Sequence, residues 1–381
     1  MTRTTIEIPI STNLRPDMIN DIRNEVARNN QRLKRHGLTS AIYADEQKSS
    51  LLLVKTCAEW MHQEYGKPQP RKLFGDFWHE GELCILFADT NLGKSILAVQ
   101  IGNHLSKADC MQPFANQLPG PAIVLYVDFE MNAKQFESRY YHSQWGSLHF
   151  GHTFYRAEFN PQADNPALYD NYDEYLTQSL EAAISKTKAQ VVIIDNLTYM
   201  RRGTERAKDA LPLMKQLKAL KTKHNLSILA LAHTPKRKGN KPLTLNDLQG
   251  SKMLINFCDS AFAIGESQNT SGARYFKQIK QRNAQQTYGE ENVCVCHIDK
   301  ELNNLHYVFD GYAHEESHLQ KRDRHLLRQQ ALHLKQQGHS YRQISQALNI
   351  GLATIARLLD GEKHNTQTEP TEPNQPSEKV L

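Results

Sequence analysis

Short apolar runs alternate with longer amphipathic segments through the middle of the chain, from about residue 71 onward. The apolar runs are Leu83–Phe87, Ile123–Val127, Val191–Ile194 and Ile228–Ala232. The amphipathic segments are Lys94–His104, Ala133–Tyr141, Leu168–Lys186 and Glu205–His224. Strands that are almost wholly apolar and are separated by helices indicate a parallel sheet buried on both faces. The pattern therefore predicts an α/β domain with a mainly parallel sheet flanked by helices.

After residue 260 the sequence becomes richer in strand-like segments. The predicted strands are Ala261–Ile264, Tyr275–Ile279, Val293–Ile298 and Leu305–Phe309. Their close spacing favours hairpins that extend the same sheet.

Both ends of the chain depart from this pattern. The N-terminal part is polar, with helices predicted at Asp17–His36 and Glu46–Tyr65 and a linker from Gly66. The C-terminal tail has too few apolar residues to build a core, so we expect it to be disordered. The expected units are residues 1–70 (helical extension and linker), 71–311 (α/β domain), 312–321 (polar connector), 322–360 (helical domain) and 361–381 (tail).

Composition disfavours several classes of protein. The 381 residues are 39% hydrophobic with a mean hydropathy of −0.63, and no apolar stretch nears the roughly 18 residues that a membrane helix needs. The six cysteines include no C-x-x-C pair, which disfavours a disulfide scaffold or a zinc ribbon. The amino terminus lacks the layout of a secretory signal. We therefore expect a cytoplasmic protein with no membrane partner.

The net charge of +5 is modest, but its distribution is uneven. Residues 318–360 hold seven basic and two acidic residues. A basic block of this kind is typical of a nucleic-acid contact, although a solvated helical surface gives the same composition. Charge alone leaves both interpretations open.

A strand-to-helix loop carries the clearest chemical signal. The segment Ala88–Ser95 fits the phosphate-loop pattern G-x-x-x-x-G-K-[ST] except at its first position, where alanine replaces glycine. Such a loop directs backbone N–H groups at a phosphate, while Lys94 would reach the β- and γ-phosphates and Ser95 would hold Mg²⁺. The alternative is a chance Gly-Lys-Ser, which the flanking strand and amphipathic helix disfavour. The predicted nucleotide-binding residues are Ala88, Asp89, Thr90, Asn91, Leu92, Gly93, Lys94, Ser95 and Ile96.

Two later strands end in acidic residues. One leads into Asp195, the arrangement that binds Mg²⁺ beside phosphates. The other leads into Asp128 and Glu130, of which Glu130 is our candidate for the base that orients the attacking water. Asp128 is the competing choice, and a surface acid at a strand end is the alternative for Glu130. The predicted cofactors are ATP and Mg²⁺, with Ser95 and Asp195 as metal ligands.

Over residues 70–310 the sequence resembles the RecA-like ATPases, in particular the branch of the RepA and DnaB hexameric helicases. The resemblance rests on further motifs that follow the phosphate loop in order. They are Val124–Met131 (VLYVDFEM), Ile228–Lys236 (ILALAHTPK), Leu248–Asp259 (LQGSKMLINFCD) and Phe276–Asn283 (FKQIKQRN). Two departures are Ala88 and the absence of a recognisable primase-binding or zinc module.

The resemblance implies roles for individual residues. Glu130 would be the catalytic glutamate, and His233 would sense the γ-phosphate, as a histidine of RepA type where DnaB proteins tend to carry glutamine. Residues 248–259 would carry a DNA-facing loop. Lys280 and Arg282 would reach the nucleotide of the neighbouring subunit, and the alternative is an exposed strand edge with ordinary charges. An arginine supplied in trans requires assembly, so the implied partner is a second copy of the chain in a hexameric ring.

The C-terminal helical segment has helix-turn-helix spacing. Gly338 is expected to end one helix, Ser340 to cap the next, and residues 349–351 to form the turn. The residues expected to pack inward are Ile344, Ala347, Leu348, Ile355 and Leu358.

Residues 331–358 resemble the DNA-binding domain of DNA invertases and resolvases, down to the run GLATIAR that ends at Arg357. The resemblance implies that the last helix enters the major groove, with Thr354 and Arg357 at the DNA and Arg342 near a phosphate. Ala353 stands where that family commonly has serine, which removes one polar contact. A packing or protein-interaction module is the alternative.

Two other patterns carry less weight. His314–His318 fits the H-E-x-x-H pattern of zinc proteases, but it lies in the predicted connector and lacks a third ligand. Cys294 and Cys296 lie on one strand face, where buried packing is favoured over metal binding.

Two functions fit the sequence. The first is a RepA-like hexameric motor that hydrolyses ATP and acts on DNA in replication of a plasmid or other mobile element, a role implied by the resemblance only. The second is an ATP-switched, DNA-binding regulator that assembles on DNA without translocating. The expected partners are duplex DNA at the helix-turn-helix, single-stranded DNA in the ring, and further copies of the chain.

Overall fold

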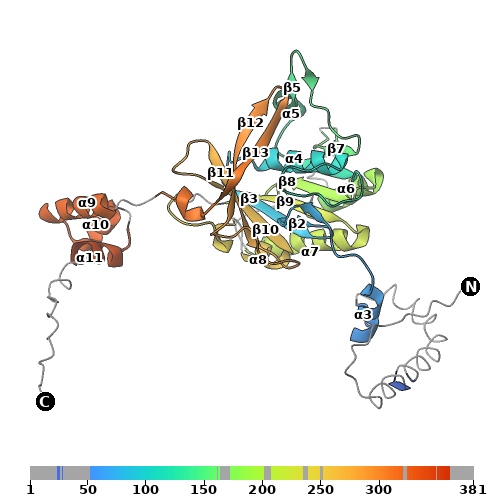
Figure 1. Cartoon of the computed structure of the whole chain (residues 1–381), viewed down its shortest axis with the longest axis horizontal. Coiled ribbons are helices and arrows are strands. Elements are labelled where there is room, and N and C mark those ends of the chain that lie inside the picture. Colours follow the sequence, from blue (N-terminus) through green and yellow to red (C-terminus); the bar gives the residue numbers. More distant parts are fainter. Residues whose placement is uncertain are drawn as a thin grey trace, which may run out of the picture. The chain divides into compact units, whose positions relative to one another are not determined.

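The computed structural model describes residues 24–25, 28, 52–160, 162–163, 172–200, 207–234, 239–248, 252–320, 324–348 and 350–360 (Figure 1). The chain divides into two compact units, Met1–Gln69 and Pro70–Leu381. Expectations for residues 1–23, 29–51 and 361–381 lie outside the described residues.

A nine-stranded sheet forms the centre of the larger unit (Figure 1). In spatial order its strands are β13 (Asn304–Ala313), β12 (Val293–Glu301), β11 (Ala273–Lys280), β10 (Ser260–Glu266), β3 (Leu83–Ala88), β9 (Ser227–His233), β8 (Val191–Asp195), β4 (Val124–Asp128) and β7 (Phe154–Ala157). The strands from β10 to β7 run parallel, and β10 to β13 pair as antiparallel hairpins. The predicted α/β sheet and its hairpin extension are confirmed.

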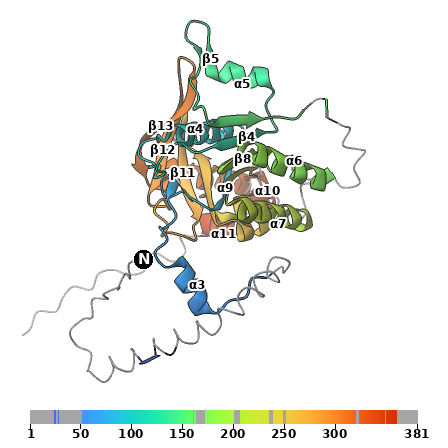
Figure 2. The same ribbon diagram turned by 90° about the vertical axis from the view of Figure 1, so that its right-hand side faces the viewer.

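Helices flank the sheet, and α6 and α7 lie side by side (Figure 2). The helices are α4 (Lys94–Lys107), α5 (Ala133–Tyr140), α6 (Tyr172–Thr187), α7 (Ala207–His224) and α8 (Lys252–Phe257). The first four agree closely with the predicted segments, whereas α8 and the edge strand β7 were not predicted. Strand β7 is only four residues long and contains Arg156, so it gives no apolar run. None of the described helices is long and apolar enough to cross a membrane.

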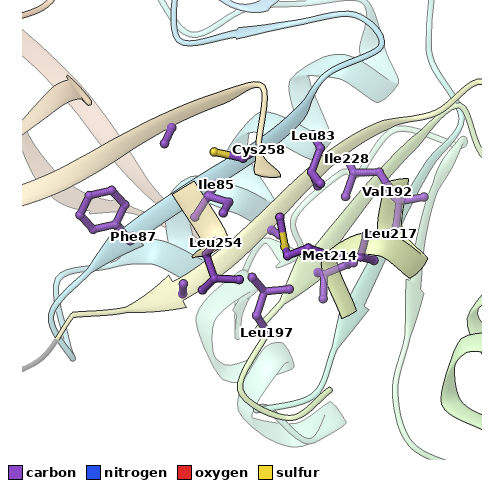
Figure 3. Close-up of a cluster of buried hydrophobic side chains, with 14 of the residues drawn as sticks. Leu83, Ile85, Phe87, Val192, Leu197, Met214, Leu217, Ile228, Leu254 and Cys258 are labelled. Atoms are coloured by element: carbon purple, nitrogen blue, oxygen red, sulfur yellow. The ribbon is translucent and has the colours of Figure 1, made fainter. Parts of the chain in front are cut away.

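The core consists of two layers, one on each face of the sheet, because side chains alternate along each strand. Leu83, Ile85 and Phe87 of β3 point to the layer that includes α7 and α8 residues such as Met214 and Leu254 (Figure 3). The intervening residues Cys84, Leu86 and Ala88 face the other layer, with Leu97 and Ile101 of α4. This alternation fixes which strand-end side chains meet the start of α4.

Smaller elements complete the unit. They are β1 (Lys72–Phe74), β2 (Trp78–His79), β5 (Tyr141–His142), β6 (Gly146–Ser147) and the 3-10 helices η2 (Leu245–Asp247) and η3 (Glu315–His318). Strands β1 and β2 pair with each other, as do β5 and β6.

The stretch after β13 was expected to be a polar connector, and the structure corrects this. Glu315 and His318 in η3 are buried. The Glu315 carboxylate lies 2.5 Å from Nζ of Lys277 and accepts a 2.6 Å hydrogen bond from the backbone N–H of Leu243. The predicted polarity was correct, but the charge is paired inside the fold. Within the described residues, no group of three or more His, Cys, Asp and Glu side chains could hold a metal ion.

The smaller unit contains helix α3 (Cys57–Glu64), which begins after a capping box between Thr56 and Glu59. The expectation of a helix from Glu46 to Tyr65 is therefore wrong for residues 52–56, which are not helical. The cap explains the later start, because the Thr56 hydroxyl accepts a hydrogen bond from the backbone N–H of Glu59 in the first turn.

Three helices follow η3 in sequence: α9 (Arg324–Gln336), α10 (Tyr341–Ala347) and α11 (Leu352–Asp360). They pack around Ala331, Ile344, Ile350 and Ile355. Gly338, at φ +86°, follows α9, and Ser340 caps α10 with Gln343. Ala347 is exposed, so the expectation that it packs inward is wrong. The predicted turn residue Asn349 lies outside the described residues.

Candidate nucleotide site at the carboxyl edge of the parallel sheet

The loop between β3 and α4 leads directly into the positive end of a 14-residue helix. Gly93 has φ +88° and provides no side-chain cap for α4, so the first N–H groups of the helix remain available to an anion. A Cβ at Gly93 would lie 2.6 Å from the Tyr307 hydroxyl, which donates a hydrogen bond to the Leu92 carbonyl. The sequence therefore needs glycine here both for backbone conformation and for space.

Alanine at the first loop position fits the local structure. Ala88 is the last residue of β3, fully buried, and pairs with His233 on β9 and Ile264 on β10. A strand residue needs no glycine-like backbone freedom. The departure from the phosphate-loop pattern therefore involves a position where a small side chain is sufficient.

The Lys94 ammonium lies inside the loop. Its Nζ donates to the carbonyl oxygens of Ala88 at 3.1 Å and Asp89 at 3.0 Å, and lies 3.1 Å from Nδ1 of His233. Burial lowers the pKa of Lys94, while the nearby carboxylates of Asp195, Glu130 and Asp89 act in the opposite direction. The lysine is thus held where an entering phosphate group would meet it.

Asp195 ends β8 on the face that meets α4, because it continues the alternation of Val191 and Ile193. Tyr126 donates a 2.7 Å hydrogen bond to its Oδ2, and the nearby Ser95 hydroxyl favours the ionised form of the carboxylate and so lowers its pKa. Burial raises the pKa of Asp195 to about 6. Its Oδ1 is buried and has no hydrogen-bond partner among the described residues.

These features of Asp195 fit a Mg²⁺ site. A hard cation prefers oxygen ligands, and a buried oxygen without a partner is costly unless a ligand satisfies it. The Ser95 hydroxyl supplies a second oxygen next to the carboxylate. The residues present therefore suit the predicted pair of metal ligands.

Glu130 and His233 come together from the ends of β4 and β9. The His233 Nε2 lies 3.2 Å from Oε1 of Glu130, and the amide of Asn196 donates to the same oxygen. The hydrogen bond from His233 is the largest cause that lowers the pKa of Glu130. Glu130 is consequently an ionised, partly exposed carboxylate beside the phosphate loop.

Asp128 has a different role from Glu130. Its Oδ1 accepts hydrogen bonds from the backbone N–H groups of Glu130 and Met131, and its Oδ2 pairs with Arg156 at 2.9 Å. Because these contacts use both oxygens and the side chain is buried, Asp128 shapes the turn that presents Glu130.

Lys280 and Arg282 lie at the other end of the strands. Lys280 is paired with Ala261, which is itself paired with Ile85 near the start of β3. Its Nζ donates to the carbonyl oxygens of Ile255 at 2.5 Å and Cys258 at 2.8 Å. Burial lowers the pKa of Lys280. The two cations are thus not part of the cluster around Lys94.

Arg282 donates to the Asn256 carbonyl at 2.9 Å and lies 3.6 Å from Asp259, with 48% of its side chain exposed. The segment expected to carry a DNA-facing loop is partly core, since Leu254 and Cys258 are buried. Residues 249–251 of that segment lie outside the described residues.

The candidate DNA contacts occur on α10 and α11. Arg342 and Arg357 are exposed and Thr354 is half-buried. Arg357 is held loosely, with Nε 3.4 Å from the Ala353 carbonyl.

Sequence reasoning missed Tyr126, Asn196 and Tyr307. Asn196 had one available signal, because it directly follows the predicted metal ligand Asp195. Tyr126 and Tyr307 act through partners 69 and 215 residues away, so no local pattern identifies them.

Two cavities help to locate the chemistry. One of about 220 Å³ adjoins the loop and is lined in part by Asp89, Leu92 and Thr234. Another of about 570 Å³ lies at the opposite strand ends, beside Val191 and Ser227. The charged side chains of Lys94, Glu130 and Asp195 lie at the same end of the sheet as the smaller cavity. The larger volume therefore does not mark the site.

Comparison with known proteins found similarity to a protein family and to a solved structure. Residues 50–239 match a family described as an AAA domain, a span that includes the loop, Glu130, Asp195 and His233. A crystal structure of a KaiC-like protein from the hyperthermophilic archaeon Pyrococcus horikoshii OT3 is similar at 11% sequence identity and a TM-score of 0.40, covering 61% of this chain and 91% of that one. No curated protein matches the sequence.

Proposed function

We propose that the chain is a Mg²⁺-dependent ATPase that assembles into a hexamer and acts as a motor on DNA, in the replication of a plasmid or other mobile element. The proposal proceeds from the match of residues 50–239 to a family described as an AAA domain. One observation carries the ATPase part. Lys94, Glu130, Asp195 and His233 meet at the start of α4, and Asp195 keeps an oxygen without a partner in the described structure.

Each residue of the site has a separate role in hydrolysis. The N–H groups at the start of α4 and the Lys94 ammonium bind the terminal phosphates of ATP. Ser95 and Asp195 would hold Mg²⁺, which neutralises charge that develops on the phosphate oxygens. Glu130 accepts a proton from the attacking water, and its ionised state at neutral pH suits this task. His233 contacts both Lys94 and Glu130, so it links the presence of the phosphate to the base.

Assembly is proposed from the position of Arg282. Within its own chain Arg282 lies at the opposite end of the strands from Lys94, but nearly half of its side chain is exposed. A head-to-tail contact brings the opposite edges of two copies together and closes into a ring when the rotation permits. Arg282, with Lys280 beside it, would then stabilise the transition state of the neighbouring copy.

The DNA contact is proposed from α10 and α11 together with the basic composition of residues 318–360. Two exposed arginines on short, well-packed helices suit contacts with phosphates and a groove.

The test compares ATP hydrolysis with and without single-stranded DNA and measures unwinding of a forked duplex. Strong stimulation together with unwinding supports the motor. Slow turnover that DNA does not change, combined with ATP-dependent assembly on duplex DNA, supports the ATP-switched regulator instead. The absence of hydrolysis in a folded, assembled protein would refute both. Arg357→Ala should weaken duplex binding, and Lys107→Ala, at an exposed lysine of α4, is the matched control.

A further inference from the structure

The amide of Asn196 lies at the centre of the site, although no pattern in the sequence assigns it a role. It follows Asp195 at the end of β8 and is fully buried. Its Nδ2 donates to Oε1 of Glu130, and the same nitrogen lies 2.9 Å from Nε2 of His233. Asn196 and His233 thus meet at one carboxylate oxygen of Glu130, and the three residues come from the ends of three different strands.

The orientation of this amide follows from its other contacts. Its Oδ1 accepts a 2.8 Å hydrogen bond from the backbone N–H of Thr198, and the Thr198 hydroxyl donates to the same oxygen. A backbone N–H can only donate, so the amide oxygen must face Thr198. The NH₂ group is therefore directed at Glu130.

The same reasoning gives the tautomer of His233. The Lys94 ammonium is a donor, so Nδ1 of His233 accepts from it and Nε2 carries the proton. Nε2 and the Asn196 amide then both donate to Oε1 of Glu130, which explains why the two nitrogens lie close together. Oε1 is occupied by two donors, and among the described residues none donates a hydrogen bond to Oε2.

We propose that Asn196 is the positioning residue of Glu130: it holds Oε1 so that Oε2 faces the attacking water, and it keeps this hold when a γ-phosphate draws Lys94 and His233 away. Asn196 suits this task better than His233 because its amide is buried and fixed by the Thr198 turn, whereas His233 is partly exposed. The inference rests on the proposed function of Glu130 as the base.

The test uses Asn196→Asp in the full chain. Aspartate keeps the acceptor oxygen for Thr198 and nearly the same shape, but it replaces the donor to Glu130 with a second carboxylate oxygen, which repels Oε1. We expect single-turnover ATP hydrolysis to fall roughly 10- to 100-fold, with KM and the affinity for a non-hydrolysable ATP analogue within about twofold of wild type. Asn246→Ala, at an exposed asparagine, should behave as wild type.

A double-mutant cycle separates positioning from a general structural effect. In a Glu130→Gln background, Asn196→Asp should cause no further loss, because the group through which it acts has already been removed. Wild-type turnover in Asn196→Asp, or a full additional loss in the Glu130→Gln background, would overturn this inference alone. An inactive wild type would instead overturn the proposed function, and the inference with it.

Discussion

The two edges of the central sheet, where its parallel strands end and where they begin, both carry charged side chains but satisfy them differently. At the edge where the parallel strands end, Lys94 and Asp195 are buried, and Asp195 keeps one oxygen without a partner in the described structure. At the edge where they begin, Lys280 and Arg282 donate to carbonyl oxygens of their own chain. A buried, unsatisfied oxygen costs free energy. We interpret the first edge as a site whose unsatisfied oxygen a ligand completes. The cations of the second edge already have partners within the chain, so this edge needs no second copy to be stable.

Lys94→Ala, at the first edge, is expected to have the largest effect on the rate of hydrolysis. The substitution removes the positive charge from the centre of the loop, so hydrolysis of MgATP should fall about 10³-fold or more. A single-turnover assay measures the change. The exposed lysine of the same helix gives the control, because Lys107→Ala should hydrolyse ATP at the wild-type rate. Comparable losses in both variants would show that the effect is not specific to the loop.

Arg282→Ala tests whether the opposite edge acts in trans. We expect a loss of about 10³-fold in hydrolysis without a change in the affinity for nucleotide, because Arg282 is remote from its own loop. Equal amounts of Lys94→Ala and Arg282→Ala chains should then recover activity in about a quarter of the sites when mixed, since each site combines a loop and an arginine from different copies. Full activity of Arg282→Ala as a monomer would contradict the trans role.

The two edges also differ in how many of their side-chain contacts the sequence predicts. Asp195 and Glu130 follow apolar strands, and the ends of parallel strands lie at one edge, so local pattern is enough to bring them together. The partners of these residues depend on register: Tyr126 reaches Asp195 because β4 pairs with β8. The contacts of Lys280 with the end of α8, and of Lys277 with Glu315, depend on packing between segments 22 to 38 residues apart. No periodicity in the sequence encodes such pairs.

Asp195→Asn should make the protein more stable and abolish Mg²⁺-dependent hydrolysis. Burial raises the folded-state pKa of Asp195 to about 6, above its ordinary value of 3.8. The unfolded chain therefore ionises at lower pH than the folded one, and wild-type stability falls as the pH rises between about 4 and 6. Asparagine removes this cost, and its amide oxygen can still accept the hydrogen bond from Tyr126.

Urea denaturation without nucleotide or Mg²⁺ measures this effect. The free energy of unfolding of Asp195→Asn should exceed that of wild type by about 3 kcal/mol at pH 8, and by less at pH 5. Asp299→Asn, at an exposed aspartate, should change little at either pH. A variant that is no more stable than wild type at pH 8 would contradict the view that the fold tolerates an unfavourable buried charge at this edge.

The smallest effect is expected from a substitution of Lys280. It should lower the free energy of unfolding, whereas Asp195→Asn should raise it. The Lys280 ammonium satisfies carbonyl oxygens at the end of α8, where helix carbonyls lack intrahelical partners. Lys280→Met should therefore lower the free energy of unfolding by about 1–2 kcal/mol, whereas Lys107→Met should have no measurable effect. If Lys280→Met is instead as stable as wild type, these contacts contribute little, and the lysine is as free as Arg282 to turn toward a neighbouring copy. The stability of this one variant thus decides whether contacts within the chain hold Lys280 at the second edge.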